Sequence, residues 1–210
     1  MTKIKLCGLS RSCDIEAANV LKPSYIGFVF APRSRRYVTM EKAAELKKLL
    51  NVDIQAVGVF VNERPETVAD LLTRGIIDMA QLHGSESEEY ISQLRSLTSK
   101  PILKAFRIDT AQDIADAQAS TADLVLLDSG SGGTGAVFDW QLIQGIHRPY
   151  FLAGGIGIDN VATAMRKLHP YGVDVSSGIE TDGVKDQQKM SAFVAAVRKE
   201  DLQNKSQGTL

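Results

Sequence analysis

Two side chains that can exchange protons each close a short apolar run. Cys7 follows Ile4-Lys5-Leu6, and Asp128 follows Leu124-Val125-Leu126-Leu127. An ionised carboxylate at such a place needs water, a partner or a ligand. Lys5 shares a strand face with Cys7, and a nearby ammonium or a phosphate-site dipole would favour a thiolate base. The alternatives are a loop cap for Asp128 and a small buried apolar residue for Cys7.

Three glycine-rich stretches follow late apolar runs in the sequence. They are Gly132-Gly133-Thr134-Gly135, Ala153-Gly154-Gly155-Ile156 and Val175-Ser176-Ser177-Gly178. Glycine lets backbone N–H groups approach an anion, and a short helix can direct its positive end at it. One such cluster alone would indicate a tight turn, whereas three on consecutive late loops favour a phosphate monoester. The candidate phosphate residues are Gly133, Gly135, Gly154, Gly155, Ser177 and Gly178.

Three arginines crowd one further loop, at Arg33, Arg35 and Arg36. A guanidinium group binds a carboxylate through two parallel hydrogen bonds, so this loop is a candidate site for a second anion. For Arg33 and Arg35 we expect solvation. We interpret His83 and Asp174 as structural, with His83 bonded to backbone and Asp174 orienting a neighbour or pairing with Lys5.

Short apolar segments alternate with segments of helical spacing along the chain. The predicted strands are Ile4 to Cys7, Tyr25 to Phe30, Ile54 to Val61, Ile77 to Leu82, Ile102 to Phe106, Leu124 to Asp128, Tyr150 to Ala153 and Gly172 to Val175. The predicted helices are Asp14 to Leu21, Met40 to Leu50, Pro65 to Thr73, Glu86 to Leu97, Ala111 to Ala119, Asp139 to Ile143, Ile158 to Leu168 and Gln187 to Lys199.

This alternation predicts parallel strands joined by right-handed crossovers. Eight units in 210 residues favour an α/β fold that closes into a (β/α)8 TIM barrel. The alternative is an open doubly wound sheet, which would want a glycine-rich turn after the first strand, where Cys7-Gly8-Leu9-Ser10 has one glycine. We expect one barrel domain over residues 1–200 and a frayed polar tail over residues 201–210.

Several residues mark helix boundaries in this pattern. Ser85 with Glu88, and Thr110 with Asp113, have the spacing of a side-chain cap, Pro65 suits a first helical position, and Gly75 suits a left-handed stop.

The composition points to a small partner. The 24 Lys and Arg nearly balance the 25 Asp and Glu, so no overall field favours nucleic acid or an anionic membrane. The chain has no apolar run of membrane-spanning length, and its N-terminus enters a strand without a signal segment, so we expect a cytoplasmic protein. Cys7 and Cys13 should then be free thiols.

The ordered set of these segments resembles the phosphoribosylanthranilate isomerase family from Lys3 to about Arg198. The most specific stretches are Ile4-Lys5-Leu6-Cys7-Gly8, Gly27 to Phe30 with Ser34 to Tyr37, Val57 to Asn62, Gln81 to Gly84, Leu126 to Ser129, Gly132 to Gly135 with Phe138 to Trp140, Ala153 to Gly155, and Val173 to Glu180.

The resemblance implies a role for each candidate. Cys7 would be the general base, Asp128 the general acid, and Arg36 the contact to the anthranilate carboxylate, with the glycine and serine loops binding phosphate. The implied reaction is an Amadori rearrangement in tryptophan biosynthesis, carried out by an aldose–ketose isomerase. It would require no metal, nicotinamide or nucleotide cofactor.

Two rival functions remain open at the level of sequence. One is the related aminoimidazole ribotide isomerase of histidine biosynthesis, which is usually associated with two aspartates where this chain has Cys7 and Asp128. The other is a phosphate-binding barrel without catalysis. For the expected isomerase the partner is a small phosphorylated substrate, with no nucleic acid or membrane, and the assembly is a monomer or a homodimer.

Overall fold

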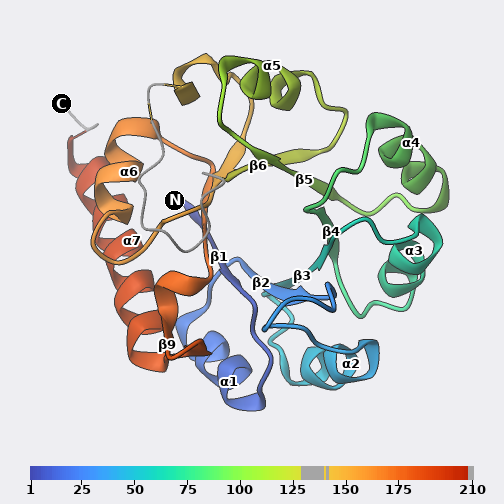
Figure 1. The fold of residues 1–210 in the computed structure, drawn as a ribbon. Coiled ribbons are helices and arrows are strands. Elements are labelled where there is room, and N and C mark those ends of the chain that lie inside the picture. The colour runs from blue at the N-terminus through green and yellow to red at the C-terminus, as the bar shows by residue number, and fades with distance from the viewer. Residues whose placement is uncertain (129–139, 141, 208–210) are drawn as a thin grey trace.

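Eight parallel strands close into a barrel in the order of the sequence in this computed structural model, and helices surround it (Figure 1). The structure describes residues 1–128, 140 and 142–207. The predicted (β/α)8 TIM barrel is therefore confirmed, with all eight predicted strands in place.

The elements have the following bounds. The barrel strands are β1 (Lys3–Cys7), β2 (Tyr25–Val29), β3 (Gln55–Phe60), β4 (Met79–Leu82), β5 (Ile102–Arg107), β6 (Leu124–Asp128), β7 (Tyr150–Leu152) and β8 (Gly172–Val175). The helices are α1 (Ser12–Leu21), α2 (Met40–Leu49), α3 (Pro65–Thr73), α4 (Glu88–Leu97), α5 (Ala111–Ala119), α6 (Val161–Leu168) and α7 (Gln187–Gln207), with 3-10 helices η1 (Leu142–Gly145) and η2 (Ser177–Ile179). Two further strands, β9 (Glu180–Thr181) and β10 (Val184–Lys185), form an antiparallel hairpin.

The barrel separates two apolar layers by the alternation of side chains along each strand. Outward residues such as Ile4 and Leu6 pack against the helices. Inward residues such as Tyr25, Leu126 and Phe151 fill the interior, where Tyr25 and Phe151 meet edge to face. This alternation also turns Cys7 and Asp128 to the inside, because they lie two positions beyond Lys5 and Leu126.

The seam between the first and last strands carries a buried ion pair. β1 and β8 pair in parallel with Lys5 opposite Asp174. Lys5 Nζ lies 2.9 Å from Asp174 Oδ1, and the two side chains are 0% and 9% exposed. The predicted pairing of Lys5 with Asp174 is thus confirmed, and it joins the two ends of the sheet.

Helix boundaries confirm some predictions and correct others. Thr110 and Asp113 form the predicted capping box, Pro65 is a first helical residue, and Gly75 has a positive φ of 67°. The prediction for Ser85 is wrong, because Ser87 caps α4 through its side chain. Ser85 instead donates to Asn62 Oδ1 from its backbone N–H and its hydroxyl.

The helix predicted over Asp139 to Ile143 lies partly outside the described residues. The described part of that region contains the 3-10 helix Leu142–Gly145.

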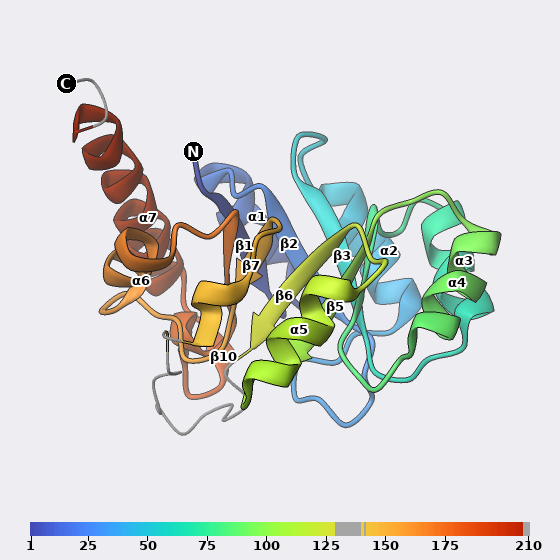
Figure 2. The same cartoon turned by 90° about the horizontal axis from the view of Figure 1, so that it is seen from above.

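The predicted tail from Asp201 is wrong over residues 201–207. Helix α7 continues to Gln207, and the Asp201 carboxylate accepts hydrogen bonds from Thr2, at 3.0 Å from its N and 2.7 Å from its Oγ1. The start of the chain and the last turns of α7 consequently lie at the same end of the barrel (Figure 2). In the described part of the chain, each helix is too short or too polar to cross a lipid bilayer.

The clasp between Thr2 and Asp201 predicts a stability effect. Replacing Asp201 by alanine removes the acceptor of these two partly buried hydrogen bonds and should lower the free energy of unfolding by about 1 to 3 kcal/mol. Urea titration followed by circular dichroism measures this change. Glu16→Ala, at an exposed position of helix α1, is the control and should leave the midpoint nearly unchanged; an equal midpoint for Asp201→Ala would contradict the clasp.

Candidate active site

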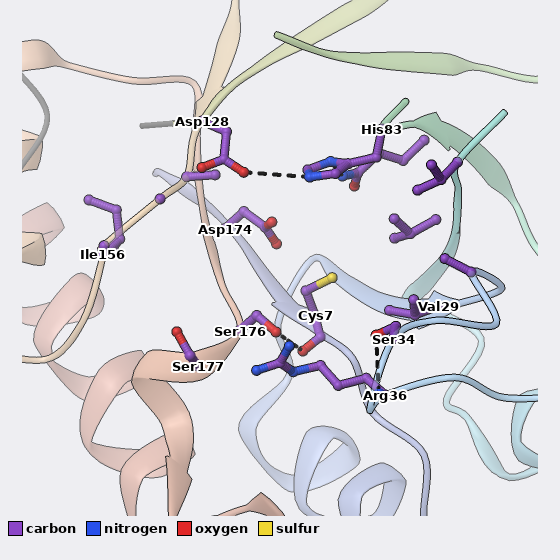
Figure 3. Close-up of a pocket in the computed structure, with 17 residues that line it drawn as sticks. Cys7, Val29, Ser34, Arg36, His83, Asp128, Ile156, Asp174, Ser176 and Ser177 are labelled. Carbon is purple, nitrogen blue, oxygen red and sulfur yellow. Dashed lines mark hydrogen bonds and ion pairs between the residues drawn. The ribbon is translucent and has the colours of Figure 1, made fainter. Parts of the chain in front are cut away.

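A cavity of about 440 Å³ opens at the carboxyl ends of the strands. Strands from opposite sides of the barrel contribute to its wall (Figure 3). It is lined by Cys7, Val29, Ala31, Ser34, Arg36, Val59, Val61, Gln81, His83, Asp128, Ala153, Gly154, Gly155, Ile156, Asp174, Ser176 and Ser177. The cavity therefore brings together Cys7, Asp128, Arg36 and the loops after β7 and β8, as the sequence predicts.

Cys7 and Asp128 come from β1 and β6 and face this cavity from different sides (Figure 3). Cys7 is 7% exposed and packs with Val29 and Val59, so its side chain lies in apolar surroundings. The Asp128 side chain is 26% exposed. A ligand in the cavity would contact a thiol and a carboxyl group at once.

Burial is the main influence on the protonation of Cys7. It raises the pKa of the thiol, and the opposing positive charge of Lys5 does not overcome it. The sequence-based expectation that a nearby ammonium would favour a thiolate is thus only partly met. Burial also acts to lower the pKa of Lys5, yet the charge of Asp174 and its hydrogen bond to Lys5 contribute to a net rise of that pKa. Lys5 consequently stays an ammonium beneath the thiol.

His83 faces Asp128 across the cavity mouth, where sequence reasoning had given it a structural role. Its Nε2 lies 3.5 Å from Asp128 Oδ2, and its Nδ1 lies 2.9 Å from Gln81 Nε2. The expectation that His83 bonds to backbone is therefore wrong. Gln81 lies on β4 and His83 follows two positions later, so both side chains point to the inside of the barrel. The Gln81 amide thereby orients the imidazole ring toward the Asp128 carboxyl group.

The loops after β7 and β8 touch each other through glycine. A Cβ on Gly178 would lie 2.6 Å from the Ile156 carbonyl oxygen, so only glycine allows this approach. Asn160 secures the first loop, because its Oδ1 accepts from Gly157 N and its Nδ2 donates to the Gly155 carbonyl. Gly154 and Gly155 both have positive φ. The predicted phosphate residues Gly133 and Gly135 lie outside the described residues.

Arg36 reaches the cavity with part of its guanidinium group already bound. Its Nε and Nη2 each lie 2.6 Å from a carboxylate oxygen of Glu180. Arg33 and Arg35 are exposed, as predicted. Arg36 is thus the arginine of this loop that lines the cavity.

A smaller hollow of about 230 Å³ adjoins the main cavity through His83 and Asp128 and is also lined by Phe106 and Arg107. Within the described ranges, no three His, Cys, Asp or Glu side chains gather as a metal site.

Comparison with known proteins identifies the family. A family model described as N-(5'-phosphoribosyl)anthranilate isomerase matches residues 4–196. The isomerase of Endomicrobium trichonymphae is 44% identical, over 94% of this chain and 99% of the relative, and that of Acetivibrio thermocellus is 45% identical, over 96% and 98%. The crystal structure of the Thermotoga maritima isomerase is 31% identical with a TM-score of 0.85, over 95% and 100%. The chain belongs to the N-(5'-phosphoribosyl)anthranilate isomerase family.

In this member of the isomerase family, several cavity residues escaped sequence reasoning. His83 and Gln81 were visible as polar residues closing a predicted strand, which was the available signal. Glu180 and Lys185, which are outside the cavity lining, gave none: Glu180 meets Arg36 across 144 positions, and Lys185 pairs with Glu180 across the hairpin β9–β10.

The buried thiol makes a measurable prediction about pH. In a Cys13→Ser background, the alkylation rate of Cys7 by iodoacetamide should reach half its maximum above the pH typical of a free cysteine, because burial raises the Cys7 pKa. The double variant Lys5→Met, Asp174→Asn should move this midpoint to still higher pH. Lys5 lowers the Cys7 pKa and Asp174 raises it, and the Lys5 effect is the larger of the two. A midpoint at or below the pH typical of free cysteine would show that burial does not raise the Cys7 pKa.

Proposed function

We propose that this chain isomerises N-(5'-phosphoribosyl)anthranilate to 1-(2-carboxyphenylamino)-1-deoxyribulose 5-phosphate in tryptophan biosynthesis, with Asp128 as acid and Cys7 as base. The observation that carries the proposal is the pair of groups on different sides of one cavity. Family membership supports it. So does a solved relative, 30% identical with a TM-score of 0.83 over 95% of this chain, which is in complex with reduced 1-(o-carboxyphenylamino)-1-deoxyribulose 5-phosphate.

In the first step, Asp128 enters protonated and gives its proton to the furanose ring oxygen. The C1–O bond opens, the nitrogen lone pair forms a C=N bond, and an iminium ion results. His83 Nε2 lies 3.5 Å from Asp128 Oδ2, next to the proposed proton donor. A proton donor placed this way can contribute about 10²- to 10⁴-fold in rate.

In the second step, Cys7 as a thiolate removes the proton from C2. The C2–H electrons form the C1=C2 bond, the iminium charge is neutralised, and the resulting enolamine ketonises to product. Burial raises the Cys7 pKa and favours the thiol, whereas the cationic iminium together with Lys5 favours release of the thiol proton to solvent water, which leaves the thiolate that acts as base.

The two ends of the substrate would hold the sugar between these groups. We assign the phosphate to the loops of Gly154, Gly155, Ser177 and Gly178, where backbone N–H groups can surround an anion. We assign the anthranilate carboxylate to Arg36, which lines the same cavity. Fixing both ends lowers the entropic part of the barrier.

The proposed partner is thus a small phosphorylated molecule, and we expect a monomer or a homodimer. The Thermotoga maritima relative is described as dimeric. We place the enzyme in the cytoplasm, where a reducing environment keeps a thiol base free.

Substitution at the two proposed catalytic residues tests the mechanism. Cys7→Ser and Asp128→Asn should each lower kcat by about 10²- to 10⁴-fold with a smaller change in KM, since each removes a proton transfer rather than a binding contact. The loss of substrate fluorescence measures turnover. Near-normal turnover in both variants would refute the roles, and turnover only of the larger aminoimidazole substrate would favour the histidine-pathway rival.

The phosphate loops make a separate prediction. Gly178→Ala should weaken inorganic phosphate binding, measured by calorimetry, because the new methyl group collides with the Ile156 carbonyl and separates the loops. The matched control is Gly145→Ala, whose methyl group would lie 3.5 Å from the Ile114 side chain, an ordinary contact. Equal phosphate affinity in Gly178→Ala and wild type would place the anion elsewhere.

A further inference from the structure

The guanidinium group of Arg36 is held along one of its two edges. Glu180 accepts from Nε and Nη2, both at 2.6 Å. A guanidinium has five N–H donors, and this pairing leaves the edge formed by Nη1 and the second Nη2 hydrogen. The Glu180 side chain is 6% exposed, whereas that of Arg36 is 30% exposed and lines the cavity. The remaining edge is therefore directed away from Glu180, and Arg36 lines the cavity.

The path of the Arg36 side chain is also constrained. A Cβ on Gly8 would lie 2.5 Å from Arg36 Cδ, so the arginine stem crosses directly over this glycine at the end of β1. Arg36 N also donates to Ser34 Oγ at 3.1 Å. The stem and the tip of the side chain are consequently both fixed before a ligand arrives.

Lys185 changes the charge balance of this cluster. Its Nζ lies 2.5 Å from Glu180 Oε1, and it donates to the Ser176 carbonyl at 2.8 Å. Burial acts to raise the pKa of Glu180, but Arg36 and Lys185 outweigh this and lower it, so Glu180 is ionised. One carboxylate between two cations leaves one net positive charge. An Arg36–Glu180 pair alone would be neutral and would attract a substrate anion weakly.

We propose that Glu180 is a positioning residue that sets specificity: it fixes the open edge of Arg36 toward the cavity as a receptor for the substrate's ortho-carboxylate, while Lys185 offsets the Glu180 charge. This inference rests on the proposed function and deepens it. Because the rotamer of Arg36 is ordered in advance, binding the carboxylate costs less side-chain entropy. The enzyme thereby distinguishes an anthranilate substrate from one made with aniline, which lacks the carboxylate.

Positioning and plain electrostatics predict opposite results for Glu180→Gln. This variant raises the net charge of the cluster by one, so attraction alone would lower KM for phosphoribosylanthranilate. Loss of positioning should instead raise KM by about tenfold, the scale of one charge-assisted hydrogen bond, with kcat nearly unchanged. The kcat/KM for phosphoribosylaniline should stay constant, so the preference for the carboxylate substrate falls. A lower KM or an unchanged preference would overturn the inference.

Lys185→Met tests the charge balance. It makes the cluster neutral and should also raise KM for the carboxylate substrate, with weaker dependence on salt than in wild type. An unchanged KM and salt dependence would contradict the proposed role of Lys185.

Two further variants complete the experiment. Glu200→Gln is the matched control, because Glu200 is a buried carboxylate paired with Arg166 at 2.6 Å outside the cavity, and the preference should not change. Arg36→Met should abolish the preference. If Arg36→Met loses the preference for the carboxylate substrate but Glu180→Gln keeps it, the role of Glu180 is rejected while that of Arg36 stands. If the wild-type protein shows no turnover of phosphoribosylanthranilate, the proposed function itself is rejected.

Discussion

The buried contact between Lys5 and Asp174 joins the fold of this protein to its chemistry. The two residues are register partners on the first and last strands, so their ion pair lies on the seam that closes the barrel. Removing one partner would strand a charge in the interior, where uncompensated ions are costly. The same ammonium lies below Cys7 and opposes the effect of burial on its pKa. Closure of the barrel and preparation of the base thus depend on one interaction.

A second set of charges organises the rim. Arg36, Glu180 and Lys185 come from the loop after β2 and from the hairpin β9–β10, which follows β8. Strands β1, β2 and β8 are neighbours in the barrel, so these late and early segments meet beside Cys7. The side chains of Asp128, His83 and Gln81 stand on the β4 and β6 side. The cavity accordingly has the proposed acid on one side and the charged cluster of Arg36, Glu180 and Lys185 next to another part of its wall.

Most of the fold followed from alternation in the sequence. The apolar runs ending at Cys7 and Asp128 predicted strands, and the period of two along a strand turned both residues inward. Interactions between distant residues were beyond such reasoning. Asp201 read as part of a polar tail because its partner Thr2 lies 199 positions away, and the Arg36–Glu180 pair spans 144. The Cys7 pKa depends on how completely the thiol is buried, which no local pattern encodes.

The clasp between Thr2 and Asp201 bears on how this barrel tolerates being joined to other proteins. Thr2 precedes β1, whereas Cys7 ends it, so the clasp and the cavity occupy opposite ends of the barrel, as the course of the chain in Figure 2 also indicates. Cys7 lies five positions beyond Thr2, a rise of about 16 Å along the strand. A domain appended before Thr2 or after Gln207 would stand clear of the catalytic mouth, and substrate would enter the barrel unobstructed.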